Sequence, residues 1–113
     1  MNELDLLKND KDIFIPSKTI YVVFGSTGDE EDKNEWIVAG FEDEQIAKDF
    51  IIACKDEAIR IVKELASKGI KSWDYDEAVQ SNKVDKHKYD PYFHSEDSEF
   101  SYRFETVKIL MEF

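Results

Sequence analysis

Two apolar runs set the architecture of this chain: Thr19-Ile20-Tyr21-Val22-Val23-Phe24 and Trp36-Ile37-Val38-Ala39-Gly40-Phe41. Both are short and rich in β-branched and aromatic residues, which is typical of β-strands. The first run is apolar on both of its faces, and this favours a central strand over an edge strand. About ten residues separate the two runs, so we expect an antiparallel hairpin with this loop at its tip.

A long helix is predicted from Glu44 to Lys68. Asp43 is a suitable N-cap, and Gly69 follows the last turn as a helix terminator. Apolar residues recur every three or four positions and form one stripe: Ala47, Phe50, Cys54, Ala58, Ile61 and Leu65. At 1.5 Å per residue this helix is about 37 Å long, whereas a six-residue strand spans about 20 Å. Its end must therefore pass the sheet, where residues 73–83 or a second copy of the chain would cover it.

The last third of the chain contains a short helix over 72–79, a polar connection and a final strand from Phe100. The apolar residues of that strand change faces, from Phe100, Tyr102 and Phe104 to Val107, Ile109 and Met111. This change predicts a bulge near 105–107, or a strand that becomes covered on both faces. The expected fold class is α+β, with an antiparallel sheet in β-β-α-α-β order packed on one long helix. Residues 1–17 form an N-terminal arm, and residues 18–113 form one α+β domain.

Charge narrows the classes of partner. The 113 residues include 26 Asp and Glu against 15 Lys and Arg, a net charge of −11. Nucleic acid and anionic membranes are repelled by this charge, so we expect no direct binding to nucleic acid and no binding to a membrane. A basic protein is favoured as the partner. The single cysteine, Cys54, excludes an intrachain disulfide, and no signal peptide or membrane-spanning run is visible. A cytoplasmic location is expected, that of the host cell if the chain is phage-encoded.

The acidic residues gather in loops. Between Ser26 and Glu44, eight acids stand against one lysine, and a second acidic run precedes the final strand. If that strand pairs beside the hairpin, the two runs would share one end of the sheet. Ten residues are the candidate partner-binding residues: Asp29, Glu30, Glu31, Asp32, Glu35, Glu96, Asp97, Glu99, Tyr92 and Phe93. A solubilising loop tip, a surface for a basic partner and a cation site are the three interpretations.

No catalytic, metal or cofactor site is predicted. The hairpin acids lack the ligand order of an EF-hand loop. The set His87, Asp90, His94 and Asp97 fits no common zinc spacing, so two solvated loop histidines are expected. Cys54 lies on the apolar helix stripe and is predicted to be a buried, inert thiol. No residue is identifiable as a nucleophile or general base.

Several short motifs of this chain resemble a family of small uncharacterised bacteriophage and prophage proteins. These motifs are Tyr21-Val22-Val23, Ser26-Thr27-Gly28, Asp32, Glu35-Trp36, the strand end 39–41, Glu44 with Ala47, and Tyr89-Asp90-Pro91. The resemblance covers about residues 18–113 and implies a phage or prophage origin, without implying an activity. The chain departs from the family pattern in its more acidic segment 29–31 and in Phe93-His94 with the acids that follow.

These observations lead to three functional hypotheses. The first is a non-enzymatic interaction protein, an inhibitor or anti-defence protein whose carboxylates occupy a basic surface on a host or phage protein, as a nucleic-acid mimic does. The second is a divalent-cation-dependent binding module or small enzyme that uses the acids of 29–35. The third is a homodimeric structural or assembly protein joined through the long helix.

Overall fold

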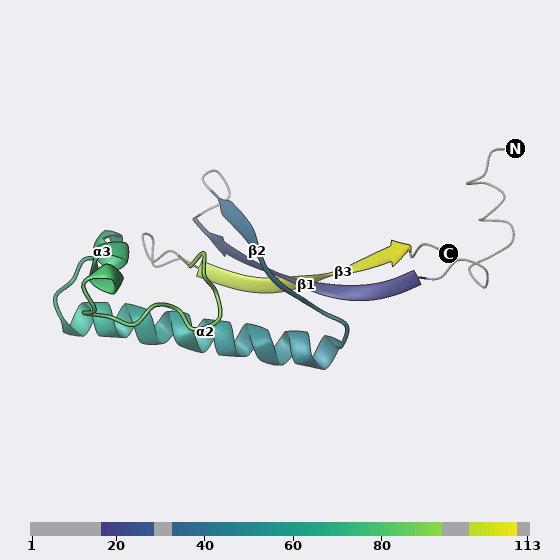
Figure 1. Cartoon of the computed structure of the whole chain (residues 1–113), viewed down its shortest axis with the longest axis horizontal. Coiled ribbons are helices and arrows are strands. Elements are labelled where there is room, and N and C mark those ends of the chain that lie inside the picture. Colours follow the sequence, from purple (N-terminus) through teal and green to yellow (C-terminus); the bar gives the residue numbers. More distant parts are fainter. Residues whose placement is uncertain (1–16, 29–32, 94–99, 111–113) are drawn as a thin grey trace, which may run out of the picture.

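The fold combines a three-stranded antiparallel sheet with two α-helices (Figure 1). The computed structural model describes residues 17–28, 33–93 and 100–110. In chain order the elements are β1 (Ser17–Thr27), β2 (Asn34–Phe41), α2 (Glu44–Ser67), the 3-10 turn η2 (Ser72–Asp74), α3 (Tyr75–Gln80) and β3 (Phe100–Leu110). The prediction of an α+β fold with an antiparallel sheet is confirmed.

β1 is the central strand of the sheet, whose order is β2-β1-β3. Its two apolar faces predicted this position. β1 and β3 pair without a register shift from Ser17 opposite Leu110 to Thr27 opposite Phe100. The bulge predicted near 105–107 is therefore wrong. A register shift occurs instead between β1 and β2, beside Val23.

β3 changes its apolar face without any help from a bulge. Tyr102 is buried on the face that meets α2, and Phe104 packs against the same core. Val107 and Ile109 project from the opposite face and are 37% and 44% exposed. The alternative prediction, a strand covered on both faces, is not met within the described residues. The sheet face turned away from α2 thus keeps apolar side chains at its surface.

α2 begins and ends where its capping residues predicted. The Asp43 carboxylate accepts a hydrogen bond from the Ile46 backbone N–H at 3.1 Å, and Gly69 takes the left-handed conformation after the helix, with φ +68°. The buried residues are Ala47, Ile51, Cys54, Ala58, Ile61 and Leu65. Ile51 thus takes the place in the buried stripe that was predicted for Phe50. The ring of Phe50 is half-buried and packs against Phe41 of β2 with 5.0 Å between centroids.

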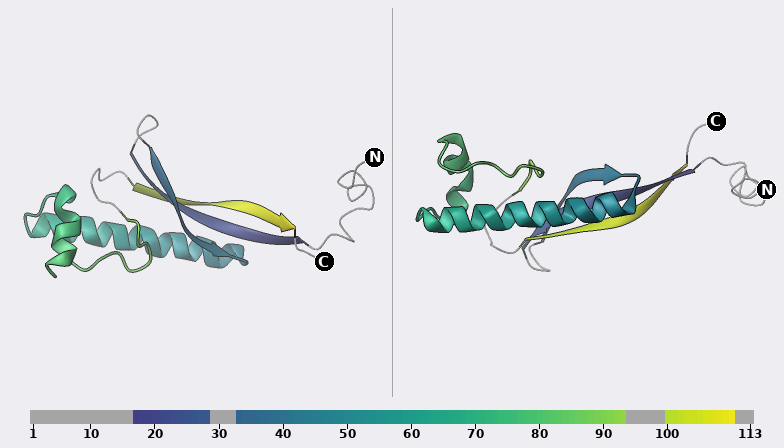
Figure 2. Two further views of the ribbon diagram at one scale, coloured as in Figure 1. Left: turned by 45° about the horizontal axis from the view of Figure 1, so that its top comes forward. Right: turned by 90° about the horizontal axis from the view of Figure 1, so that it is seen from below.

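The end of α2 that passes the sheet is covered by α3 (Figure 2). Tyr75 and Ala78 of α3, together with Val84, are buried in the same apolar core as Leu65. This helix end was expected to be covered either by residues 73–83 or by a second copy of the chain. In the structure the chain's own segment 73–83 covers it. Within the described residues, no helix is both long and apolar enough to span a membrane.

Candidate functional site

Residues 84–93 run beside α2 and bury every third side chain. Val84, His87, Asp90 and Phe93 are each at most 3% exposed, whereas the residues between them are exposed. Bends and a turn shape this segment, and hydrogen bonds within it join the backbone N–H of Asp90 to His87 and that of Phe93 to the carbonyl of Asp90. The segment therefore brings one histidine and one carboxylate into the core.

The carboxylate of Asp90 joins both edge strands of the sheet. It accepts the indole N–H of Trp36 on β2 at 3.0 and 3.1 Å and the hydroxyl of Tyr102 on β3 at 2.8 Å. It also accepts the backbone N–H of Tyr92 at 3.0 Å, an Asx turn that Pro91 favours. Asp90 is 1% exposed, so these donors take the place of solvent around the carboxylate.

His87 is fixed in one tautomer by its neighbours. Its Nδ1 atom accepts the backbone N–H groups of Tyr89 at 3.1 Å and Asp90 at 2.9 Å. Its Nε2 atom lies 2.9 Å from the carbonyl oxygen of Cys54, which can only accept, so Nε2 carries the hydrogen. Nε2 therefore holds the segment against α2, while Nδ1 fixes the backbone turn within the segment. The prediction of a solvated histidine is wrong for His87; His94 lies outside the described residues.

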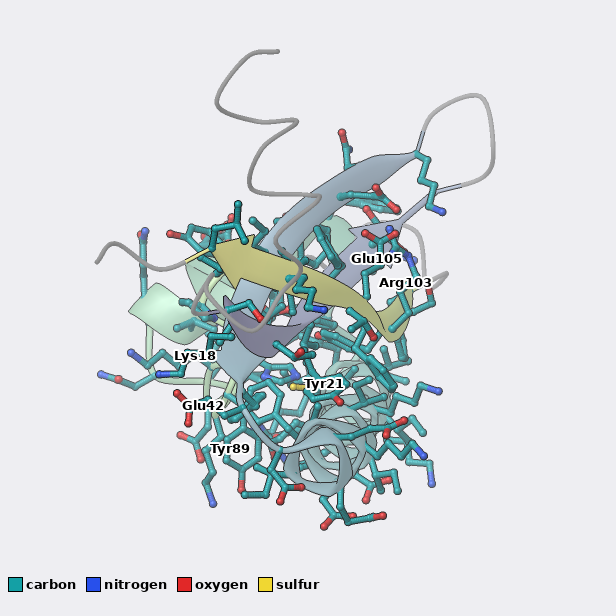
Figure 3. The ribbon with its side chains drawn as sticks, turned by 90° about the vertical axis from the view of Figure 1, so that its right-hand side faces the viewer. Lys18, Tyr21, Glu42, Tyr89, Arg103 and Glu105 are labelled. Atoms are coloured by element: carbon teal, nitrogen blue, oxygen red, sulfur yellow. The ribbon has the colours of Figure 1, made fainter. Side chains whose placement is uncertain are left out.

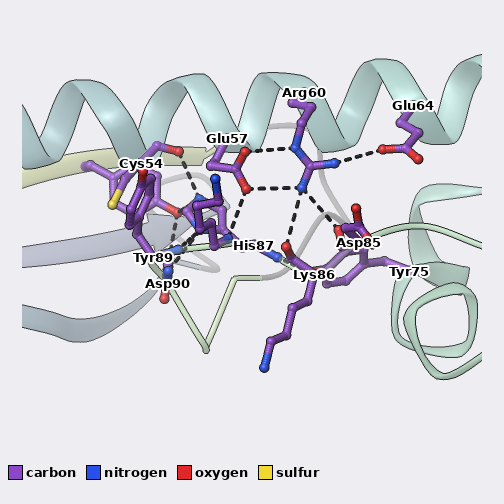
Figure 4. A network of polar contacts seen from close by, with 12 residues as sticks. Cys54, Glu57, Arg60, Glu64, Tyr75, Asp85, Lys86, His87, Tyr89 and Asp90 are labelled. Atoms are coloured by element: carbon purple, nitrogen blue, oxygen red, sulfur yellow. Dashed lines mark hydrogen bonds and ion pairs between the residues drawn. The ribbon is translucent and has the colours of Figure 1, made fainter. Parts of the chain in front are cut away.

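Arg60 holds the same segment from the outer flank of α2 (Figure 4). Its guanidinium donates to Glu57 at 2.8 and 3.1 Å, to Glu64 at 2.8 Å, and to the backbone carbonyl of Asp85 at 3.2 Å. Glu57 in turn accepts the backbone N–H of Lys88 at 2.9 Å. The hydrogen bond from Arg60 is the main reason that the pKa of Glu57 is lowered to about 2. Its carboxylate therefore stays ionised at neutral pH.

Cys54, His87, Asp90 and Tyr102 form a buried cluster that stabilises the fold. Its potentially reactive groups are not available for chemistry. Burial, reinforced by the charges of Asp90 and Glu57, raises the pKa of the Cys54 thiol to about 12, so the nucleophilic thiolate is scarce. The pKa of Tyr102 is also raised, chiefly by burial and secondly by the hydrogen bond that its hydroxyl donates to Asp90. Every buried side-chain nitrogen and oxygen in the described ranges has a hydrogen-bond partner. Across the same ranges, no group of three or more His, Cys, Asp or Glu is arranged to hold a metal ion.

The net charge of the chain is concentrated outside the described residues. Within them, 14 Asp and Glu stand against 13 Lys and Arg, a sum of −1. Because the whole chain carries −11, the remaining −10 belongs to residues 1–16, 29–32, 94–99 and 111–113. The body formed by the helices and strands is therefore nearly neutral.

Two of these acidic segments join the sheet at the same end. Segment 29–32 contains four acids and separates β1 from β2, while segment 94–99 contains three acids and precedes β3. Thr27 of β1 is paired with Asn34 of β2 on one side and Phe100 of β3 on the other. Neighbouring strands lie about 4.8 Å apart, so these points of attachment fall within about 10 Å.

Three of the ten candidate partner-binding residues fall in the described ranges. Glu35 accepts a hydrogen bond from Arg103 at 2.9 Å and pairs with Lys33 at 3.3 Å, and the bond from Arg103 is the main cause of its lowered pKa. Tyr92 is 58% exposed. Phe93 is 3% exposed, with its ring 5.6 Å from that of Tyr75, so the prediction that it contacts a partner is corrected. The other seven lie outside the described residues: Asp29, Glu30, Glu31, Asp32, Glu96, Asp97 and Glu99.

The contribution of Asp90 and His87 to the core was missed from the sequence, although one signal for it is present. The three-residue spacing of Val84, His87, Asp90 and Phe93 marks a buried segment without helix or strand periodicity. Comparison with protein-family models, with curated proteins and with solved structures finds no match for this chain.

Proposed function

We propose that this chain is a small non-enzymatic interaction protein of the phage type that its motifs resemble, which inhibits a host or phage protein by occupying a basic surface on it. In this role the carboxylates of 29–32 and 94–99 stand where the partner would otherwise hold nucleic-acid phosphates. An anti-defence protein is the biological form of this proposal.

The observation that carries the proposal is the common attachment of two acidic segments. Seven acids join the sheet at the ends of three adjacent strands, while the described body is nearly neutral. Like charges gathered in this way repel one another and cost stability, and a basic partner would relieve that repulsion on binding. Long-range attraction to a basic groove would also speed association.

The internal bonding of the buried groups favours binding over catalysis. Both ring nitrogens of His87 hold backbone groups, and the pKa of Cys54 is raised well above its usual range. An acid, base or nucleophile drawn from this cluster would have to break the bonds that keep residues 84–93 in place.

A direct test begins with capture of a partner from a bacterial lysate on the immobilised chain, followed by affinity measurement with the purified partner. The test variant combines Asp29→Asn, Glu30→Gln, Glu31→Gln and Asp32→Asn. Exposed charge pairs contribute about 0.2 to 1 kcal/mol each, so the four changes together should weaken binding about tenfold or more. The affinity of the parent should also fall as salt rises.

The matched control removes four exposed acids on or next to the N-terminal half of α2: Glu42→Gln, Glu44→Gln, Asp49→Asn and Asp56→Asn. It changes the net charge by the same amount at positions outside both acidic segments. Equal weakening by both sets would show that only net charge matters. Unchanged affinity in the test variant would reject segment 29–32 as a binding surface.

A further inference from the structure

β3 presents a long unpaired edge. One side of β3 pairs with β1 over its whole length, and no described residue forms a strand on its other side. The strand has 11 residues, contains no proline, and ends in the exposed side chains of Val107, Ile109 and Leu110. Unpaired backbone N–H and C=O groups along such an edge readily pair with another strand.

An exposed apolar flank of α2 lies on the same side of the molecule. Phe50 contacts Phe41 of β2, which shows that its flank of the helix faces β2. Ile52 lies two residues after Phe50, about 200° around the helix, and is therefore on the opposite flank. Ile59 lies two turns after Ile52 on this opposite flank. These isoleucines are 58% and 43% exposed. β2 and β3 lie on opposite sides of α2 when the fold is seen from below (Figure 2), so this flank is on the β3 side.

We propose that a second copy of this chain pairs antiparallel with the free edge of β3, giving a two-fold dimer with one continuous six-stranded sheet. The two helices then lie on the same face of that sheet, and the flank that carries Ile52 and Ile59 is on the side of each helix nearer the other copy. A two-fold pairing of this kind covers the same edge of β3 on both copies. The proposal does not depend on the proposed function.

Charge complementarity favours one register of this pairing. In a two-fold antiparallel pair one residue lies opposite itself, and residues equally distant from it lie opposite each other. With Phe104 at the centre, Arg103 faces Glu105 of the partner subunit, and the reciprocal pair forms at the same time. Centring on Arg103 or on Glu105 would instead place like charges opposite each other, which is unfavourable. Within one chain, Arg103 and Glu105 already lie together on the sheet face turned away from α2, with 2.8 Å between the guanidinium and the carboxylate (Figure 3).

The same register has consequences at its ends. Phe100 falls opposite Lys108 of the partner subunit. The acidic segment 94–99, which leads into Phe100, is therefore attached to the sheet next to that lysine. Ser101 falls opposite Val107 of the partner subunit. Each pair across the centre occurs twice, because the two-fold axis repeats it.

Charge reversal tests the proposal by sedimentation of the full chain at low salt. Arg103→Glu and Glu105→Arg each place like charges opposite each other twice, so each should weaken dimerisation about tenfold or more. An equimolar mixture of the two variants restores opposite charges at both pairs and should form a heterodimer. Lys33→Glu and Glu42→Arg are the matched controls, since they break exposed ion pairs elsewhere with the same charge changes; both should dimerise as the parent does.

Disulfide trapping tests the register independently. A Ser101→Cys/Val107→Cys variant should form covalent dimers on mild oxidation, because the two positions are about 20 Å apart along one strand and meet only between copies. Each single variant should give none, since neither position faces itself. A parent chain that stays monomeric at hundreds of micromolar would overturn the proposal. So would cross-linking of Val107→Cys alone, or a mixture of the charge variants that stays monomeric while each is folded by circular dichroism.

Discussion

Trp36 donates its indole N–H to the buried carboxylate of Asp90, 54 residues further along the chain. This bond joins β2 to the turn that precedes β3, and Tyr102 of β3 donates to the same carboxylate. Two of the short sequence motifs, Glu35-Trp36 and Tyr89-Asp90-Pro91, thus meet in one cluster. These bonds join the two edge strands of the sheet to residues 84–93.

Replacing Asp90 should destabilise the protein strongly. Asp90→Ala leaves the indole N–H of Trp36, the hydroxyl of Tyr102 and the backbone N–H of Tyr92 without their acceptor in the core. Each unsatisfied buried donor costs about 1 to 3 kcal/mol, so we expect a loss of about 3 to 5 kcal/mol in urea unfolding. Asp56→Ala, an exposed acid on α2, should change the free energy of unfolding by no more than about 0.5 kcal/mol. Similar losses in both variants would contradict the assigned role of Asp90.

Gly25 should tolerate no larger residue, because its cross-strand neighbour is Trp36. A Cβ atom at Gly25 would lie 2.6 Å from the indole ring, whose position the bond to Asp90 also fixes. Gly25→Ala must therefore displace the ring, with an expected cost of about 1 to 3 kcal/mol. Gly40→Ala is the control, because its Cβ would lie 3.3 Å from the methyl end of Ile20. A Gly25→Ala protein as stable as the parent, with unchanged near-ultraviolet circular dichroism, would refute this argument.

Local patterns predicted much of the fold. The apolar faces of β1 predicted a central strand, and Asp43 and Gly69 predicted the ends of α2, because capping and alternation are encoded within a few residues. The path of β3 was not predicted. Its change of apolar face was interpreted as a bulge or as a strand covered on both faces, since the sequence does not show that a sheet face can stay uncovered by its own chain.

The buried cluster could not be predicted for a different reason. The bond between Trp36 and Asp90 spans most of the domain, and no local periodicity encodes such a pairing. His87 and Asp90 also lie in a polar segment, where exposure is the usual expectation. The three-residue burial repeat could have marked the segment as packed, but its partners depend on the tertiary fold.

The thiol of Cys54 should resist modification in the folded protein. It is fully buried, and its pKa is raised to about 12, so little thiolate forms at about pH 8 and reagents cannot reach it. We expect an aromatic disulfide reagent to react with Cys54 only at the rate of unfolding, and at once in denaturant. A Ser101→Cys variant carries an additional exposed thiol and should show one fast and one slow reaction. Fast reaction of the parent would show that the core around Cys54 opens readily.

Glu57 should make folding stability depend on acid pH. Its pKa is lowered from 4.5 to about 2 in the folded protein, chiefly by the hydrogen bond from Arg60, so protonation favours the unfolded state. The stabilisation is fully present above about pH 4.5 and is lost as the pH falls through about 2. The urea midpoint of the parent should therefore fall more steeply across this window than that of Glu57→Gln, which cannot ionise.

A second glutamate provides the control for this pH dependence. Glu77→Gln removes an exposed acid on α3, and its urea midpoint should follow the parent curve in shape. The difference between the parent and Glu57→Gln should be constant above about pH 4.5, where Glu57 is ionised in both states. It should shrink as the carboxylate in the unfolded chain takes up its proton. Parallel curves for the parent and Glu57→Gln throughout the acid range would show that Arg60 holds residues 84–93 without help from the charge of Glu57.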